Sequence, residues 1–363
     1  MDAILVLEDG YTARGRSLGK AGIATGEAVF NTCMAGYQEI LSDPSYCGQL
    51  VVMTYPLIGN YGINVEDIEA ERPALSGFIV REYSETFSNH RASNSLDQYL
   101  KDCGVAGIRD VDTRALTRHI REKGALRGAI ASGDTTRDEV LAQVRQSPVM
   151  TGRDLVSEVT RPGIETWPAE GEPAHRVALY DFGAKLSILR SLARRGIETT
   201  VFPAKTPAKE ILEGDFRGLV LSNGPGDPDA VGYGIENVKQ LVGKLPILGI
   251  CMGHQILALA LGAKTYKLKF GHHGGNQPVK NLATGRVEIT SQNHGFAVEP
   301  GSLEGGPAVV SHINLNDGTV AGIAAAELNA VSVQYHPEAA PGPRDSAYVF
   351  DEFRSRLDAL LVT

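Results

Sequence analysis

The chain has 363 residues, a length that favours about two domains, each long enough to bury a core of its own. Hydrophobic residues make up 42% and charged residues 21%, the ordinary balance of a globular protein. The formal net charge of -8 argues against nucleic acid as the main partner, because a phosphate backbone requires a basic surface.

Cysteine usage and apolar runs bear on the cellular compartment. The four cysteines, at positions 33, 47, 103 and 251, form no CxxC pair, so we expect neither a zinc ribbon nor a disulfide framework. Their scarcity favours a reducing, cytoplasmic setting. The apolar run near Met1 is too short for a secretion signal, and no run reaches about 18 apolar residues, so we expect no membrane span.

The first part of the chain, residues 1–155, predicts a mixed α/β domain whose fold the pattern alone does not name. The run from Ala3 to Leu7 predicts a strand, and the Asp-Gly pair after it suggests a hairpin. Residues Asp112 to Lys123 predict a helix that begins at Asp112 or Thr113 and ends before Gly124.

Residues 156–174 contain three prolines together with several glycines and glutamates, and show no sustained period of either kind. This composition predicts an interdomain linker.

The remaining part, residues 175–363, alternates strands with helices. Such alternation predicts an α/β domain with a doubly wound, mainly parallel sheet, whose ligands bind beyond the carboxyl ends of the strands. The expected strands are Val177–Phe182, Glu198–Phe202, Gly218–Ser222, Pro246–Ile250 and Val331–Tyr335, and the expected helices are Lys185–Arg195, Ile235–Val242 and Gln255–Leu261.

A cysteine flanked by glycines lies where the fourth of these strands passes into a helix. The segment Gly249-Ile250-Cys251-Met252-Gly253 has the spacing of the G-x-S-x-G nucleophile elbow, with Cys in place of Ser. At the N-terminus of a helix the partial positive charge favours a thiolate, and the N–H of Met252 is placed to receive an oxyanion. The alternative is a small buried cysteine with a packing role only.

Two further motifs follow predicted strands. In His336-Pro337-Glu338, the period of two puts His336 and Glu338 on one side, so Glu338 can hold Nδ1–H and leave Nε2 facing a thiol. The loop Asn223-Gly224-Pro225-Gly226-Asp227-Pro228 offers backbone N–H groups for an oxyanion or a substrate carboxylate. The alternatives are a surface turn for the first motif and a simple tight turn for the second.

These three motifs together resemble the signatures of class I (triad) glutamine amidotransferases. Further stretches resemble the small subunits of carbamoyl-phosphate synthase, so the similarity extends over nearly the whole chain. The N-terminal stretches matter most, since other members of the class lack that half. The stretches are Asn31–Ile40, Asp43–Tyr46, Tyr55–Gly62, Phe270–Val279 and Gln292–Val298.

The resemblance implies a catalytic triad of Cys251, His336 and Glu338, and no metal. His272 and His273 are adjacent on an extended segment and point to opposite faces, which makes them poor joint ligands and favours a structural role. The residues that the resemblance assigns to the glutamine pocket are Ser45, Gly224, Gly226, Met252, Gln255, Asn293, Gly295 and Phe296.

The resemblance also implies a reaction and a partner. Cys251 would attack the side-chain carbonyl of L-glutamine, and the released ammonia would pass to a separate large subunit that makes carbamoyl phosphate from bicarbonate and ATP. The sequence contains no G-x-x-x-x-G-K-[ST] loop, so ATP and Mg are expected on that subunit and no cofactor on this one. The expected assembly is a heterodimer or a higher oligomer, serving arginine synthesis, pyrimidine synthesis or both.

Three other functions are compatible with a cysteine–histidine pair. One is the glutaminase of another pathway, such as anthranilate or GMP synthesis, against which the N-terminal half argues. A second is a non-catalytic binding module, against which the intact triad argues. A third is a cysteine peptidase, against which the glutamine-pocket residues argue.

Overall fold

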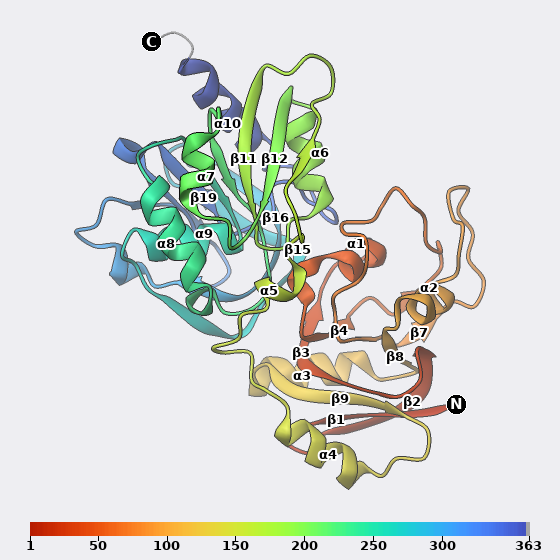
Figure 1. Ribbon diagram of the computed structural model, residues 1–363. Coiled ribbons are helices and arrows are strands. Elements are labelled where there is room, and N and C mark those ends of the chain that lie inside the picture. Colours follow the sequence, from red (N-terminus) through yellow and green to blue (C-terminus); the bar gives the residue numbers. More distant parts are fainter. Residues whose placement is uncertain (361–363) are drawn as a thin grey trace. The chain divides into compact units, whose positions relative to one another are not determined.

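The computed structural model describes residues 1–360, which form two compact units (Figure 1). Unit 1 consists of Met1–Thr151 and Lys269–Gly274. Unit 2 consists of Gly152–Leu268 and the chain from Gly275 onward. Each unit has hydrophobic clusters of its own, as expected of separate domains.

Unit 1 is built on a closed barrel in the order β1-β2-β8-β6-β4-β3-β9, with β9 pairing back to β1. The predicted first strand and hairpin are confirmed, because β1 pairs antiparallel with β2. The barrel strands are β1 (Asp2–Leu7), β2 (Thr12–Gly19), β3 (Ile23–Asn31), β4 (Gln49–Met53), β6 (Gly77–Ile79), β8 (Ala106–Arg109) and β9 (Leu126–Ser132).

Alternation along the strands divides the side chains of unit 1 between clusters. In β4, Leu50 and Val52 join the cluster that contains Leu5 and Ile130, whereas Val51 joins the cluster that contains Tyr37 and Ile40. The remaining elements of this unit are α1 (Tyr37–Ser42), η1 (Pro44–Tyr46), β5 (Leu57–Ile58), β7 (Glu82–Tyr83), α2 (Leu96–Cys103), α3 (Thr113–Lys123) and α4 (Arg137–Gln146).

Helix α3 confirms the helix predicted in this half. The Asp112 side chain caps it by accepting from the Ala115 N–H at 3.0 Å. At the other end the Gly124 N–H donates to the Ile120 carbonyl at 2.8 Å.

Unit 2 contains a ten-stranded sheet in the order β10-β12-β11-β13-β14-β19-β18-β17-β15-β16. Its strands are β10 (Glu165–Trp167), β11 (His175–Asp181), β12 (Ile197–Pro203), β13 (Leu219–Leu221), β14 (Ile247–Ile250), β15 (Thr265–Asn281), β16 (Val287–Val298), β17 (Val309–Asn314), β18 (Val320–Ala325) and β19 (Ala330–Val333).

The run β12-β11-β13-β14-β19 is parallel throughout, and helices cover both of its faces. Leu219 and Leu221 pack with α7, α8 and α9, whereas Val220 packs with α6 and α10. The predicted doubly wound sheet is therefore confirmed, and β18, β17 and β15 extend it by antiparallel pairing. The helices are α6 (Leu186–Ala193), α7 (Ala208–Glu213), η2 (Pro228–Ala230), α8 (Gly232–Leu241), α9 (Met252–Ala260), η3 (Pro300–Leu303), η4 (Ala326–Leu328) and α10 (Tyr348–Ala359).

The segment predicted as an interdomain linker, residues 156–174, contains regular structure. This segment belongs to unit 2, where it forms the short helix α5 (Val156–Val159) and the edge strand β10. Strand β10 pairs antiparallel with β12. The two elements have four and three residues, too few to show a period, and Pro162 and Pro168 lie just outside β10.

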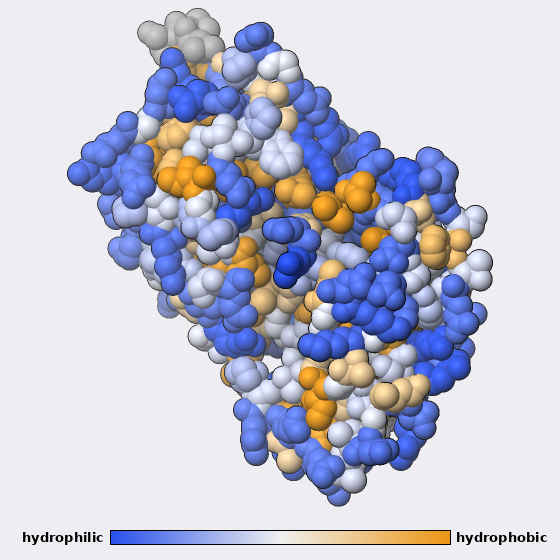
Figure 2. All heavy atoms as spheres, turned by 45° about the vertical axis from the view of Figure 1, so that its right-hand side comes forward, coloured by the Kyte–Doolittle hydropathy of each residue, from blue (hydrophilic) through white to orange (hydrophobic). Residues whose placement is uncertain are grey.

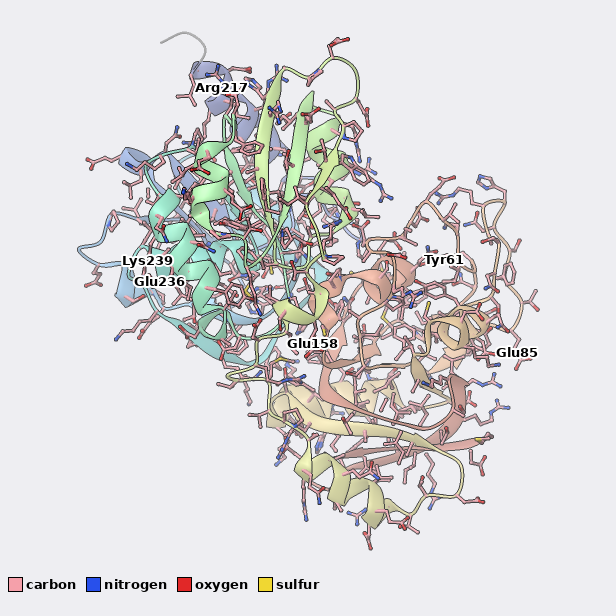
Figure 3. All side chains as sticks on the ribbon, viewed as in Figure 1. Tyr61, Glu85, Glu158, Arg217, Glu236 and Lys239 are labelled. Atoms are coloured by element: carbon pink, nitrogen blue, oxygen red, sulfur yellow. The ribbon has the colours of Figure 1, made fainter. Side chains whose placement is uncertain are left out.

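The surface shown in Figure 2 is mostly hydrophilic, and hydrophobic residues appear there in small groups. A surface ion pair lies on α8, where Lys239 Nζ is 2.6 Å from Glu236 Oε1, and both residues are labelled in Figure 3. Among residues 1–360, no helix combines the length and the apolar character needed to cross a bilayer.

Candidate active site

The turn between β14 and α9 holds Cys251 in a strained conformation. Its φ of 53° and ψ of −103° lie where non-glycine residues rarely occur. A Cβ on Gly253 would lie 2.1 Å from the Leu221 carbonyl oxygen, and one on Gly249 would lie 2.7 Å from the Gly253 carbonyl oxygen. The glycines therefore allow the helix to pack closely on the sheet, as the elbow predicts. Helix α9 begins at Met252, three residues before the predicted start at Gln255.

The first turn of α9 leaves one backbone donor without an acceptor. The Gly253 N–H donates to the Ser222 carbonyl at 2.9 Å, and the next two N–H groups donate to the Cys251 carbonyl. Among residues 1–360, the Met252 N–H has no such acceptor. A helix N-terminus with a free N–H beside a thiol is suited to stabilising an oxyanion.

The histidine of the predicted triad lies just beyond β19. Its backbone N–H donates to the Ser291 carbonyl at 2.8 Å, and its Nδ1 lies 2.6 Å from Glu338 Oε1. Burial lowers the pKa of His336, but its electrostatic interactions with Glu338 and Cys251 outweigh this effect and raise the pKa to about 10. The raised pKa favours the protonated ring, in which Nδ1–H donates to Glu338.

A buried lysine completes this charge array, and sequence reasoning missed it. Lys185 Nζ lies 3.0 Å from Glu338 Oε1 and donates to the Ala339 carbonyl at 2.6 Å. Burial raises the pKa of Glu338, but the charges of Lys185 and His336 outweigh it and lower this pKa to about 2. The only signal in the sequence is a lysine shortly after a predicted strand, just before the first apolar residues of the next helix.

Hydrogen bonds between neighbouring loops place Lys185. Asp181, the last residue of β11, accepts from the backbone N–H groups of Gly183 at 3.0 Å and Ala184 at 2.6 Å. The Lys185 N–H then donates to Asn223 Oδ1 at 3.0 Å. The loop after β11 is thereby tied to the loop after β13.

The glycines of the predicted loop after β13 are required by its shape. A Cβ on Gly224 would lie 2.2 Å from the Phe182 carbonyl oxygen. Gly226 has a φ of +90°, and a Cβ there would lie 2.8 Å from the Arg153 carbonyl oxygen. Asp227 fixes the end of this loop by accepting from the Gly152 N–H at 2.8 Å. Contact of Gly224 and Gly226 with glutamine stays a prediction.

The structure brings Gln255 and the predicted residues of β16 to the same centre in unit 2. Gln255 Nε2 donates to the Phe296 carbonyl at 2.7 Å, and the Cys251 thiol donates to the Asn293 carbonyl at 3.5 Å. A Cβ on Gly295 would meet nothing within 4 Å, so its backbone borders open space.

Ser45, the remaining predicted pocket residue, belongs to unit 1. It lies in the short helix η1, where its N–H donates to Asp43 Oδ1 at 2.9 Å. Its contact with glutamine stays a prediction.

The adjacent histidines of β15 are both buried in unit 1. The His273 carbonyl accepts from the Thr32 N–H at 3.2 Å, and the His273 ring centroid lies 6.0 Å from that of Tyr46. Within the described part of the chain, no group of three or more His, Cys, Asp or Glu side chains is arranged to hold a metal ion.

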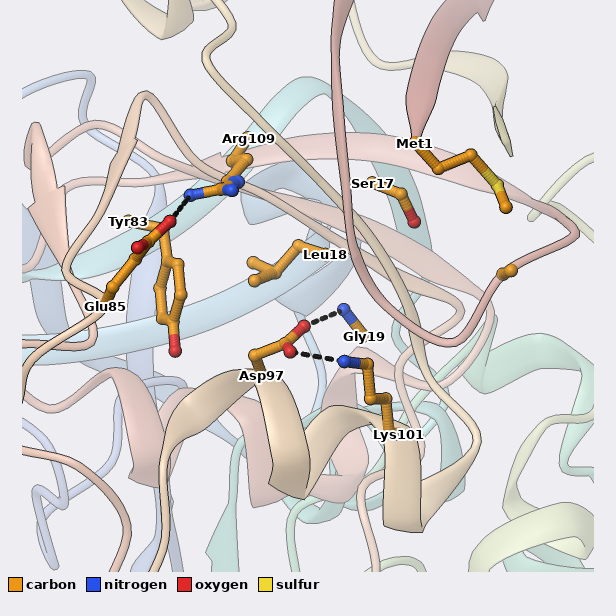
Figure 4. A pocket seen from close by; sticks show the side chains of 10 residues that line it. Met1, Ser17, Leu18, Gly19, Tyr83, Glu85, Asp97, Lys101 and Arg109 are labelled. Atoms are coloured by element: carbon orange, nitrogen blue, oxygen red, sulfur yellow. Dashed lines mark hydrogen bonds and ion pairs between the residues drawn. The ribbon is translucent and has the colours of Figure 1, made fainter. Parts of the chain in front are cut away.

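A cavity of about 480 Å³ lies in unit 1, and none of the predicted site residues lines it (Figure 4). Its charged side chains pair with one another, because Arg109 Nη1 lies 2.9 Å from Glu85 Oε1 and Lys101 Nζ lies 2.6 Å from Asp97 Oδ2. Asp97 also accepts from the Gly19 N–H at 2.8 Å. The charges of this cavity are thus satisfied within unit 1.

Comparison with known families assigns both halves of the chain. Residues 5–130 match the model of the carbamoyl-phosphate synthase small chain, CPSase domain. Residues 178–355 match the model of class I glutamine amidotransferases.

Relatives match the chain over nearly its whole length. The carbamoyl phosphate synthase small chain of Syntrophotalea carbinolica is 54% identical over 370 residues, covering 99% of this chain and 98% of that one. The one from Chlorobaculum tepidum is 53% identical over 362 residues, covering 99% and 98%. The one from Thermus thermophilus is 48% identical over 368 residues, covering 98% and 93%. The chain therefore belongs to the carbamoyl phosphate synthase small chain family, as an enzymatic subunit with a class I glutamine amidotransferase domain.

Proposed function

We propose that Cys251 is the nucleophile with which this glutaminase subunit hydrolyses L-glutamine. In this proposal His336 transfers protons, and Glu338 orients His336. The observation that carries the proposal is the buried array around the elbow. Lys185 and His336 share one oxygen of Glu338, and Cys251 lies close enough to His336 to raise the pKa of that ring. A thiolate and an imidazolium at a helix N-terminus are the groups that nucleophilic attack on an amide requires.

The reaction follows from these groups. The Cys251 thiolate attacks the side-chain carbonyl carbon of glutamine, and the Met252 N–H, together with that of Gly224, stabilises the oxyanion. The C–N bond then breaks as His336 gives its proton to the departing nitrogen, which leaves as ammonia. A γ-glutamyl thioester remains on Cys251. Neutral His336 next takes a proton from water, whose oxygen attacks the thioester and releases glutamate.

We further propose that the ammonia passes to a separate large subunit, which makes carbamoyl phosphate from bicarbonate and ATP. Two features support this: the relatives are named small chains, and the sequence lacks a phosphate-binding G-x-x-x-x-G-K-[ST] loop. ATP and Mg would bind to that partner, and this chain would need no cofactor. We propose a heterodimer in the cytoplasm, which supplies carbamoyl phosphate for arginine synthesis, pyrimidine synthesis or both.

Replacing the nucleophile tests the proposed function. Cys251→Ala should abolish glutamine-dependent carbamoyl phosphate synthesis by the assembled enzyme, because the thioester cannot form. Synthesis from added ammonia should persist, because that chemistry belongs to the partner. Both activities can be assayed side by side, with Cys103→Ala, a partly exposed cysteine of unit 1, as the matched control. Glutamine hydrolysis that survived Cys251→Ala would refute the assignment.

A further inference from the structure

A buried glutamine outside the triad contacts the nucleophile. Gln334 lies directly after β19, is 1% exposed, and precedes His336 by two residues. Its Nε2 lies 3.8 Å from Cys251 Sγ, and its Oε1 accepts from Gln255 Nε2 at 3.0 Å. Its backbone N–H donates to the Ala321 carbonyl at 2.9 Å. Both ends of its side-chain amide are therefore engaged.

A chain of hydrogen bonds fixes which end of this amide faces the thiol. The amino group of Gln255 has two hydrogens, and it donates to both the Phe296 carbonyl and Gln334 Oε1. Because the Phe296 carbonyl can only accept, Gln255 must present its amino group on this side. Gln334 must then present its oxygen to Gln255 and its N–H to Cys251.

The sulfur thus lies between an acceptor and a donor. The Asn293 carbonyl accepts from the thiol at 3.5 Å and favours the protonated form. The Gln334 N–H favours the thiolate, because a donor to an ionised group gives a stronger bond than a donor to a neutral one. We propose that Gln334 is a positioning residue that holds the Cys251 thiolate and sets its reactivity toward glutamine. This inference rests on the proposed function, because it takes Cys251 as the nucleophile.

Two variants separate the contact with sulfur from the contact with Gln255. Gln334→Glu keeps the shape of the side chain and an acceptor for Gln255, but places an acceptor where Cys251 meets a donor. Gln334→Met keeps the approximate volume and removes both contacts. Ser332→Ala is the matched control: Ser332 is buried in β19, two residues before Gln334, but its Oγ contacts His254 Nδ1 at 2.9 Å.

The measurement is the pH profile of iodoacetamide alkylation of the full-length chain, with the Cys251 adduct quantified by peptide mass spectrometry. Gln334→Met should slow alkylation at neutral pH about tenfold and shift the midpoint upward by about one pH unit, since a hydrogen bond to a charged group has about this strength. Gln334→Glu should shift the midpoint at least as far, and Ser332→Ala should not shift it. A loss of folded protein alone would lower the amplitude and leave the midpoint in place.

The same variants are assayed for glutamine hydrolysis beside Cys251→Ala. Both Gln334 variants should lose kcat/KM in proportion to their slower alkylation at the same pH. If Cys251→Ala is inactive while both Gln334 variants keep the wild-type midpoint, the inference about Gln334 is wrong and the proposed function stands. If Cys251→Ala keeps hydrolysing glutamine, the proposed function itself has failed. Should Gln334→Met not fold, the isosteric Gln334→Glu decides alone.

Discussion

Lys185 is a buried cation that contacts the carboxylate of the proposed triad. It is 2% exposed, and its Nζ contacts the same Glu338 oxygen that contacts His336 Nδ1. Lys185→Met would leave the fully buried carboxylate with one counter-charge in place of two. Breaking a buried ion pair at one partner costs about 3–5 kcal/mol, and we expect a loss of this size in the free energy of unfolding. Urea denaturation of the full chain at pH 7 measures it.

The control is a lysine whose ion pair lies at the surface. Lys239 pairs with Glu236 on α8, both partners are largely exposed, and Lys239→Met should cost at most about 1 kcal/mol. A second comparison adds Glu338→Gln to Lys185→Met. Because each change removes the partner of the other, their combined cost should be smaller than the sum. Equal costs for the two lysine variants would contradict the role given to Lys185.

The residues of the site differ in how far the sequence could predict them. Cys251 is flanked by glycines at fixed spacing, and His336 and Glu338 are two positions apart, so each carries a pattern. Lys185 and Gln334 carry none, because each is a single polar residue next to a strand. They reach the site because β11, β14 and β19 are parallel members of one sheet, so the loops after these strands lie at the same edge.

At the scale of the elements, the packing of α9 on β13 depends on Gly253. A Cβ there would lie 2.1 Å from a backbone oxygen of Leu221, which cannot rotate away as a side chain can. We expect Gly253→Ala to lower the free energy of unfolding by about 1–3 kcal/mol or more and to slow Cys251 alkylation, because the helix must move. Gly301→Ala is the control, since a Cβ there meets nothing within 4 Å. Wild-type stability in Gly253→Ala would show that the contact can relax.

Whether an element could be predicted depended on its burial and length. The parallel strands are buried along nearly their whole length, and some, such as β14, are continuous apolar runs, so the sequence predicts them. Strand β10 has three residues at the edge of the sheet, too few for any period, so the composition of its segment predicts a linker instead. The antiparallel strand β15 mixes buried and exposed positions irregularly along its 17 residues, so the sequence pattern does not predict it.

At the scale of the whole molecule, unit 1 was the part whose fold the sequence pattern could not name. Its barrel closes through pairings between distant segments, such as β3 with β9 and β6 with β8. Hydrophobic alternation reports which face of a strand is buried and says nothing of its neighbour in the sheet. The topology of unit 2 is easier to predict, because strand–helix alternation itself implies parallel neighbours.

The division of labour between this chain and its proposed partner gives a prediction for the whole enzyme. If ammonia released at Cys251 is delivered directly, glutamine labelled with ¹⁵N in its amide should give carbamoyl phosphate that keeps the label in the presence of excess unlabelled ammonium. Mass spectrometry of the product of the assembled enzyme measures this retention. Cys251→Ala supplies the control, because its product must take nitrogen from the unlabelled pool. Label diluted to the ratio of the bulk solution would mean that ammonia escapes before it is used, and direct delivery would then be excluded.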